Sequence, residues 1–407
     1  MKLHKMRREI LGLDIIRFLS AVLVIGFHFG FIFWLPDVPA GRIMQLPSLA
    51  SAQLPAVWFG FIGVQIFFVI SGFVISFSAE GSNAFEFFRD RFVRLAPCLW
   101  ICATLSLLID FIFGIDGPIF SSYLREITFF PFGPWLDVVV WTLGIEIAFY
   151  ACVFVLLSIG RFAWIEYLAA YLGGASLFYQ AYSIGTRCDV LAWSGDCSGW
   201  FSVSRTNELT LLDHGCFFSV GVFLWLWLVK GRSISQLWWI GPASVACVVQ
   251  ILGFSVYAHR AGHLVGYHGP YSPWVPVLIW AGGVLAIVAS VRFNAVIRAA
   301  CGDRVASFVR LIGLSTYPLY LVHYVSAGAI VWALYKVGVG LSVAIWSAGF
   351  AMVALSFVIV LVFEPPLKLL LRSILNQAGA ALSASIPRLK FLFVPAAAAV
   401  QKRPQAQ

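Results

Sequence analysis

The stretch DIIRFLSAVLVIGFHF, residues 14–29, contains an arginine and a histidine in a segment that is otherwise apolar enough for lipid. Arg17 and His28 are eleven positions apart. Eleven steps of about 100° end about 20° past three full turns, so both side chains lie on one helix face, about 16 Å apart along the axis. A charge near the bilayer centre costs roughly 2.5–3.5 kcal/mol, which favours a functional role. The alternative is a snorkelling arginine and a packed histidine.

The composition assigns the chain to a class of protein. Hydrophobic residues make up 61% of its 407 residues and charged residues only 11%, whereas soluble domains contain about 25% charged residues. The formal net charge is +9, but the basic residues lie between apolar segments and form no single patch for nucleic acid. The sequence therefore predicts an all-α fold, a polytopic membrane helix bundle.

Hydropathy and turn signals predict about ten transmembrane helices. Their expected ranges are 13–34, 57–78, 95–114, 137–158, 161–179, 209–229, 237–256, 274–292, 311–335 and 341–363. The first range is too long for a cleaved signal peptide and has aromatic residues where a cleavage site would need small ones, so we expect it to be retained. We expect residues 1–366 to form the membrane domain and residues 367–407 to form a basic, partly disordered cytoplasmic tail.

The basic residues predict the orientation of the bundle. Of the 27 Lys and Arg residues, 20 fall in segments that are cytoplasmic if the N-terminus is inside, six fall outside, and Arg17 lies within a helix. The positive-inside rule then places both termini in the cytoplasm. Cys188 and Cys197 fall in a predicted outer loop, where a disulfide is an open alternative. No spacing of cysteines indicates zinc, and we predict no metal.

Three further groups of polar residues interrupt the apolar segments. Arg91 and Arg94, in FFRDRFVRLAP, are three apart and share a helical face near the inner membrane surface. They are either a positive-inside anchor or a cradle for phosphate, whose oxygens match the guanidinium fork. Glu146, in WTLGIEIAFY, lies near the middle of a predicted span with Thr142 and Tyr150 one turn away on either side. A buried carboxylate needs a partner, which favours function here.

The third group is LSTYPLYLVHY, in which His323 follows Tyr317 and Tyr320 within a predicted span. Taken alone, a histidine among aromatic residues is more often a packed residue of the core than a functional one. The sequence by itself leaves both interpretations open for His323.

In combination, these motifs resemble the acyltransferase-3 family of integral membrane acyltransferases, from about residue 11 to residue 366. The similar features are Arg17 and His28 with ten residues between them, GVQIFFVISGFVIS at 63–76, Arg91 and Arg94 ahead of a proline, WTLGIEIAFY, and YLVH ending at His323. The order and spacing together are specific, although each motif alone is weak. Thr142 departs from the family pattern, which usually has Trp-Ser-Leu there.

The resemblance implies an O-acyltransferase of the bacterial inner membrane. The donor would be acyl-CoA, most simply acetyl-CoA, and the acceptor a hydroxyl of a cell-surface or exported carbohydrate. Arg17, Arg91 and Arg94 would then bind the donor phosphates. His28 would act as the general base, oriented by Glu146, while Tyr320 and His323 would line the acceptor path.

Two other classes of protein fit parts of the sequence. A ten-helix transporter or flippase of a polar or lipid-linked substrate would also have polar intramembrane residues, but we find no repeat or matched pair of interrupted helices. A pH sensor could use His28 and His323, but it leaves the arginine cluster unexplained. The sequence does not identify the acceptor sugar, the acyl length or the oligomeric state.

The orientation is testable by labelling single cysteines with a membrane-impermeant reagent. We expect a cysteine at Ser82 to stay unlabelled in cells whose outer membrane alone is permeabilised, because Ser82 precedes the basic segment that contains Arg91 and Arg94. Cys188 and Cys197 should react under the same conditions once any disulfide is reduced. Labelling at Ser82 would contradict the orientation.

Overall fold

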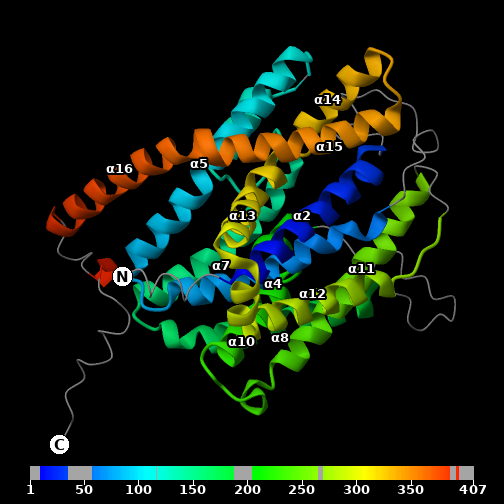
Figure 1. The fold of residues 1–407 in the computed structure, drawn as a ribbon. Helices are drawn as coiled ribbons and strands as arrows, with labels where there is room; N and C mark the ends of the chain where they lie inside the picture. Colours follow the sequence, from blue (N-terminus) through cyan, green and yellow to red (C-terminus); the bar gives the residue numbers. More distant parts are fainter. Residues whose placement is uncertain are drawn as a thin grey trace, which may run out of the picture.

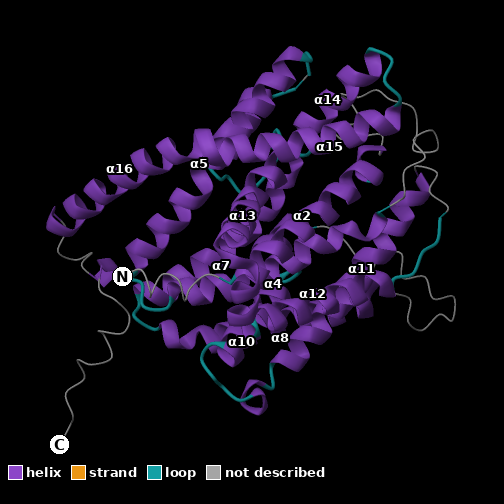
Figure 2. Cartoon of the chain, in the orientation of Figure 1, coloured by secondary structure: helices purple, strands orange, loops and turns teal. Residues whose placement is uncertain are grey.

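The structure is a computed structural model that describes residues 10–34, 57–115, 117–187, 204–264, 269–385 and 391–393. Within these residues the regular secondary structure is entirely helical (Figure 2). Eight helices are long and apolar enough to cross a membrane. The predicted all-α, polytopic helix bundle is therefore confirmed, and the protein is a multi-pass membrane protein.

Figure 1 shows the helices that form the eight candidate spans, coloured in the order of the sequence. They are built from α2 (Leu11–Gly30), η3 (Trp58–Phe61) with α4 (Ile62–Ala79), α5 (Ala84–Ile112), η4 (Val138–Val140) with α7 (Trp141–Ser158), α11 (Ile240–Leu264), α12 (Trp274–Arg292), α13 (Asn294–Val322), and a continuous rod of α15 (Leu341–Val358), η7 (Ile359–Phe363) and α16 (Glu364–Ser385).

Shorter or less apolar helices complete the bundle. They are η1 (Ile32–Trp34), α6 (Ile119–Ile127), η5 (Phe162–Trp164), α8 (Ile165–Arg187), α9 (Arg205–Leu209), α10 (Gly215–Leu228), η6 (Ile234–Leu237) and α14 (Val325–Lys336). Of these, α8 and α10 occupy the positions of the fifth and sixth predicted spans. The long α8 is less apolar than the eight spans, and α10 is shorter.

The helix predicted over 311–335 is wrong in its extent. The sequence predicts a single helix over 311–335, but the structure ends α13 at Val322 and begins α14 at Val325. At the break, Asp137 from a distant loop accepts a hydrogen bond from the Val325 backbone N–H at 3.4 Å. This long-range contact gives the first turn of α14 an acceptor that hydropathy cannot reveal.

The centre of the bundle is α4, which packs between α2 and α10 (Figure 1). Glycines make this packing close. A Cβ atom on Gly72 would lie 2.2 Å from the Phe218 carbonyl oxygen, and one on Gly221 would lie 2.1 Å from the Val69 carbonyl oxygen. Gly63 meets the α2 backbone in the same way, 2.2 Å from a carbonyl oxygen. Small residues let backbones approach in membranes, where packing rather than hydrophobicity holds helices together.

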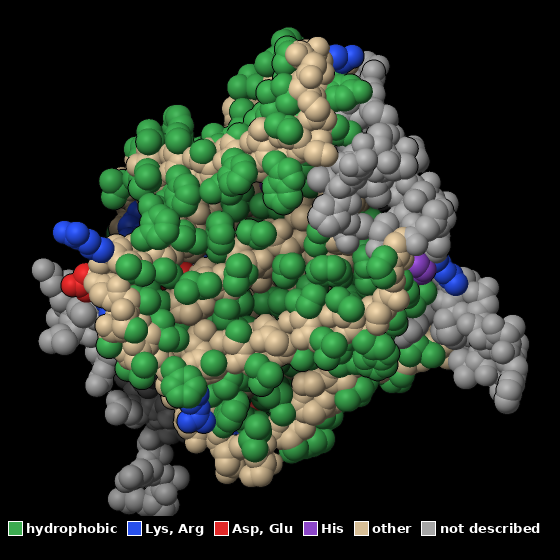
Figure 3. Space-filling view, turned by 45° about the vertical axis from the view of Figure 1, so that its right-hand side comes forward, with side chains coloured by type: hydrophobic (Ala, Val, Ile, Leu, Met, Phe, Trp, Pro, Cys, Tyr) green, Lys and Arg blue, Asp and Glu red, His purple; other side chains and the backbone are tan. Residues whose placement is uncertain are grey.

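The outer surface of the bundle is suited to lipid. Figure 3 shows hydrophobic side chains over most of one face, with a few Lys and Arg side chains near its margins. Large side chains such as Phe111 (76% exposed) and Phe350 (73% exposed) belong to this surface. A soluble protein rarely exposes an apolar area this continuous, so the surface agrees with the membrane-spanning lengths of the helices.

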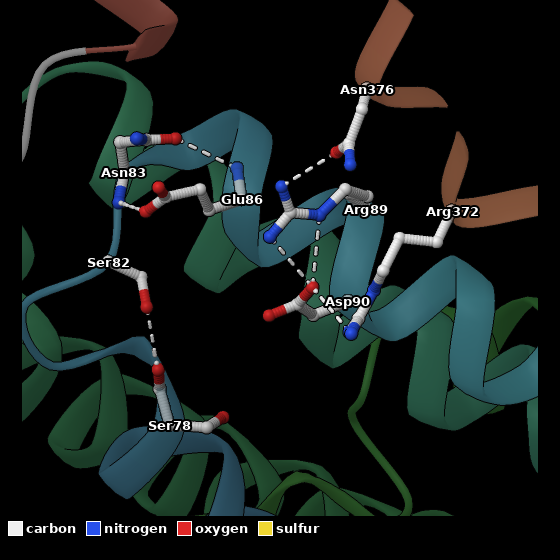
Figure 4. Close-up of polar contacts among 8 residues, drawn as sticks. All are labelled: Ser78, Ser82, Asn83, Glu86, Arg89, Asp90, Arg372 and Asn376. Atoms are coloured by element: carbon white, nitrogen blue, oxygen red, sulfur yellow. Dashed lines mark hydrogen bonds and ion pairs between the residues drawn. The ribbon is translucent and has the colours of Figure 1, made fainter. Parts of the chain in front are cut away.

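A capped turn fixes the beginning of α5. Asn83 Oδ1 accepts a hydrogen bond from the Glu86 backbone N–H at 2.8 Å, and Glu86 Oε2 accepts one from the Asn83 N–H at 3.4 Å (Figure 4). This reciprocal capping box satisfies two N–H groups at the helix end.

The rod's final segment, α16, lies against the same end of α5. Arg89 donates to Asp90 and, at 3.0 Å, to Asn376 of α16, while Arg372 of α16 reaches Asp90 at 3.4 Å (Figure 4). These exposed contacts each stabilise the fold only modestly. Together they hold α16 beside the part of α5 that contains Arg91.

The close packing of α4 against α10 predicts a large effect of one methyl group. We expect Gly72→Ala to lower the unfolding temperature of the purified protein in detergent, because the new Cβ overlaps the Phe218 carbonyl and overpacking costs roughly 1–3 kcal/mol. Gly282→Ala in α12 is the matched control, because its Cβ would meet no atom within 4 Å. Equal unfolding temperatures for the two variants would contradict this packing account.

Candidate active site

Five helices, α2, α4, α5, α7 and α13, surround a cavity of about 110 Å³. Apolar side chains form much of its wall. Its polar lining consists of Arg17, Ser71, Arg91, Arg94, Thr142, Glu146, Tyr150, Thr316, Tyr317 and Tyr320. The cavity thus brings together residues from five separate parts of the chain, including five of the seven site residues predicted from the sequence.

Arg17 enters the cavity from α2 and forms an ion pair with Asp14. Its guanidinium lies 3.6 Å from Asp14, one turn earlier on the same helix. Asp14 is buried and also pairs with Arg310 of α13 at 3.2 Å. One carboxylate is therefore shared between two guanidinium groups, so Asp14 neutralises Arg17 only in part.

Arg91 and Arg94 enter the same cavity from α5. Their spacing of three residues places them on one helical face, as the sequence predicts. The Arg91 Nε atom is buried and has no hydrogen-bond partner among the residues that the structure describes. Arg94, which also lines the cavity, is exposed and lies close enough to Arg17 for the two charges to interact.

Glu146 is the one carboxylate among the residues that line the cavity. It accepts hydrogen bonds from Ser71 Oγ at 2.6 Å and from Tyr150 OH at 2.5 Å. Its charge acts on Arg17 and Arg91. These two hydroxyl donors fix the position of the half-buried carboxylate.

The hydrogen bonds of Glu146 differ from those that the sequence analysis expects. The sequence analysis makes Glu146 the group that orients His28, but its hydrogen-bond partners are Ser71 and Tyr150. The physical reason is depth in the bundle. Glu146 lies near Arg17, and His28 is about 16 Å further along α2.

The partner of His28 is His323. His28 Nδ1 lies 2.6 Å from His323 Nε2, with ring centroids 4.8 Å apart and ring planes 29° apart. His323 Nδ1 lies 2.7 Å from the Tyr320 carbonyl oxygen. His28 does not line the cavity itself. Tyr320 links the cavity to the histidine pair, because it lines the cavity and its ring centroid is 5.6 Å from that of His323.

Two buried carboxyl groups outside the spans support this part of the fold. Asp137 accepts hydrogen bonds from the backbone N–H groups of Val139 at 3.1 Å and Val325 at 3.4 Å. Glu126 accepts from the N–H groups of Leu136 and Asp137, both at 3.1 Å. Burial raises the pKa of Glu126 to about 7. Burial, and next the Glu126 charge, raise the pKa of Asp137 well above its usual range.

Sequence reasoning found some partners and missed others. The spacing of four residues correctly indicated that Tyr150 is near Glu146. Thr142, on the same face, hydrogen-bonds to the Tyr320 hydroxyl at 3.0 Å and so joins α7 to α13. Ser71 was not singled out, although it lies in the motif at 63–76, because the spacing within one helix does not show which serine faces Glu146. The disulfide considered for Cys188 and Cys197 lies outside the described residues.

The described residues contain no group of three or more His, Cys, Asp or Glu side chains that could hold a metal ion. The cavity offers an excess of positive charge, and the histidine pair lies beyond Tyr320 on its wall. The arginines can bind an anion, and an imidazole with a free ring nitrogen can accept a proton.

Comparison with known proteins agrees with these features. Residues 10–364 match the acyltransferase-3 family, described as an acyltransferase domain. A search of the curated proteins and a search of the solved structures each found no significant match. The match to the family covers nearly the whole chain, which favours an acyltransferase over a transporter. The chain is a member of the acyltransferase-3 family of membrane acyltransferases.

Proposed function

We propose that the protein transfers an acyl group, most simply acetyl, from cytoplasmic acyl-CoA to a hydroxyl of a cell-surface or exported carbohydrate, in a bacterial inner membrane. The observation that supports this most directly is the cavity into which Arg17, Arg91 and Arg94 converge. Membership of the family supports acyl transfer in general. The donor and the class of acceptor are our inference.

The charge balance of the cavity favours an anionic donor. Its lining contains three guanidinium groups and one carboxylate, and Arg91 Nε has no partner among the described residues. A buried polar atom without a hydrogen bond is costly. The phosphates of CoA would satisfy the arginines, since the guanidinium fork matches phosphate oxygens in geometry and charge.

The position of His28 suits the chemistry at the other end of the donor. With the phosphates at the level of Arg17, an extended pantetheine arm would direct the thioester along α2 toward His28, about 16 Å away. His28 would take the proton of the acceptor hydroxyl as that oxygen bonds to the acyl carbon. The carbon–sulfur bond breaks, and the CoA thiolate regains a proton from His28.

Tyr320 and His323 are both predicted to line the acceptor path, but we propose this role for Tyr320 alone. Tyr320 lines the cavity and remains a candidate for contact with the acceptor. His323 is completely buried and both of its ring nitrogens are engaged. It therefore has no free polar atom to offer an acceptor.

The donor site predicts a specific effect on affinity. We expect Arg91→Ala and Arg94→Ala to weaken acyl-CoA binding by roughly 10- to 100-fold, since a hydrogen bond to a charged group contributes about 1.5–3 kcal/mol. Lys should restore binding poorly, because it lacks the guanidinium fork. Acetyl-CoA affinity of the purified protein in nanodiscs, measured by isothermal titration calorimetry, tests this expectation.

Arg89→Ala is the matched control, because Arg89 is on the same helix but its contacts are with Asp90 and Asn376. It should bind acetyl-CoA as the wild type does. Unchanged affinity in correctly inserted Arg91→Ala and Arg94→Ala proteins would remove the donor site.

The catalytic role predicts the opposite pattern for His28. We expect His28→Ala to reduce acyl transfer roughly 10²- to 10⁴-fold, the usual contribution of a general base, with little change in donor affinity. The assay follows labelled acetyl groups from acetyl-CoA into carbohydrate esters in inverted membrane vesicles that contain the native acceptor. His259→Ala, at a histidine stacked on Tyr271 away from the cavity, is the control.

Near-normal ester formation by His28→Ala, at matched membrane abundance, would remove His28 as the base. If wild-type vesicles form no new ester compared with vesicles from a deletion strain, the proposed reaction itself is wrong.

A further inference from the structure

The hydrogen bonds of the histidine pair have defined directions. A carbonyl oxygen only accepts, so the 2.7 Å contact between His323 Nδ1 and the Tyr320 carbonyl requires a proton on Nδ1 of His323. A neutral imidazole has one N–H. His323 Nε2 is therefore the bare nitrogen, and it can only accept.

The direction of the second hydrogen bond follows from the first. His28 Nδ1, 2.6 Å from His323 Nε2, must be the donor. When both rings are neutral, the proton of His28 is on Nδ1 and its free lone pair is on Nε2. A general base needs such a lone pair.

We propose that His323 is a positioning residue that holds His28 in the tautomer with a bare Nε2. This inference rests on the proposed function, in which His28 is the base. In the reaction, the acceptor hydroxyl gives its proton to His28 Nε2, and the Nδ1–H bond to His323 is kept throughout. His323 thus does what the third residue does in a catalytic triad, where the wrong tautomer reduces turnover by about 10⁴-fold.

The fold holds His323 firmly in this role. Because α13 ends at Val322, the Tyr320 carbonyl belongs to its last turn, whose carbonyls need partners outside the helix. His323 is 0% exposed, so water does not compete for its nitrogens. The Tyr324 ring lies edge-on to His28, with centroids 5.2 Å apart, and limits rotation of the imidazole.

Ionisable side chains around the pair are few. Tyr320 and Tyr324 contact the rings of His323 and His28 respectively. Asp137 accepts a hydrogen bond from the backbone N–H of Val325, two residues after His323. The Tyr320 hydroxyl bonds to Thr142, and the Tyr324 hydroxyl has no hydrogen-bond partner among the described residues, so His323 alone defines the tautomer of His28 among these groups.

A chemically fixed tautomer provides the test. We expect His323→Ala to reduce the turnover number roughly 10²- to 10⁴-fold with unchanged donor affinity, because His28 then loses the acceptor of its Nδ1–H. Replacing His28 by Nδ1-methylhistidine leaves only Nε2 with a lone pair, whatever its neighbours. In the His323→Ala background, this replacement should restore turnover at least 10-fold, with the methyl group occupying space left by the removed imidazole.

The arms of the experiment separate this inference from the proposed function. Inactivity of His28→Ala together with rescue of His323→Ala by Nδ1-methylhistidine supports both. If His28→Ala is inactive but His323→Ala keeps wild-type turnover, or loses it without rescue at normal abundance and donor affinity, the tautomer role is overturned and the base remains. Full activity of His28→Ala overturns both.

Discussion

The attraction between the Glu146 carboxylate and the guanidinium groups of Arg17 and Arg91, inside a bundle surrounded by lipid, is the constraint on which the rest of the site depends. Glu146 is held by Ser71 and Tyr150, and its charge acts on Arg17 and Arg91. Buried charges are stable only when they are paired and hydrogen-bonded. The helices that contribute these groups, α2, α4, α5 and α7, are therefore fixed relative to one another at this level. The remaining positive charge requires an anion, which the donor would supply.

The second constraint is the separation between this charged level and the histidine pair. Arg17 and His28 are on one face of α2, about three turns apart. At the level of Arg17 the site has the positive charge to bind an anion. At the level of His28, the two histidines form a pair in which both rings are hydrogen-bonded. An enzyme that joins a cytoplasmic donor to an exported acceptor needs this division, because donor and acceptor approach from opposite sides.

Local helical geometry explains what the sequence could predict. The spacing of eleven between Arg17 and His28, of three between Arg91 and Arg94, and of four between Glu146 and Tyr150 each define one helix face. Spans could be predicted because lipid requires long apolar helices, each of which satisfies its own backbone hydrogen bonds.

Long-range pairing explains what could not be predicted. His28 and His323 are 295 positions apart, and Ser71 and Glu146 are 75 apart. The spacing of residues within one helix does not indicate contacts with a distant part of the chain. At the break between α13 and α14, the Val325 N–H finds its acceptor in Asp137, also from a distant loop, and hydropathy does not reveal such a contact. The hydrogen bond between Glu146 and Ser71 could not be predicted for the same reason, because a motif within α7 does not show which residues of α4 lie beside it.

The most direct test of the central claim, that donor phosphates and the reacting thioester occupy two levels of one path along α2, is an electron cryomicroscopy structure of the protein with CoA bound in a lipid nanodisc. The account predicts phosphate density within hydrogen-bond distance of Arg17, Arg91 and Arg94, and the CoA sulfur on the His28 side of that density. Phosphates bound away from these arginines, or a thiol directed away from His28, would contradict it.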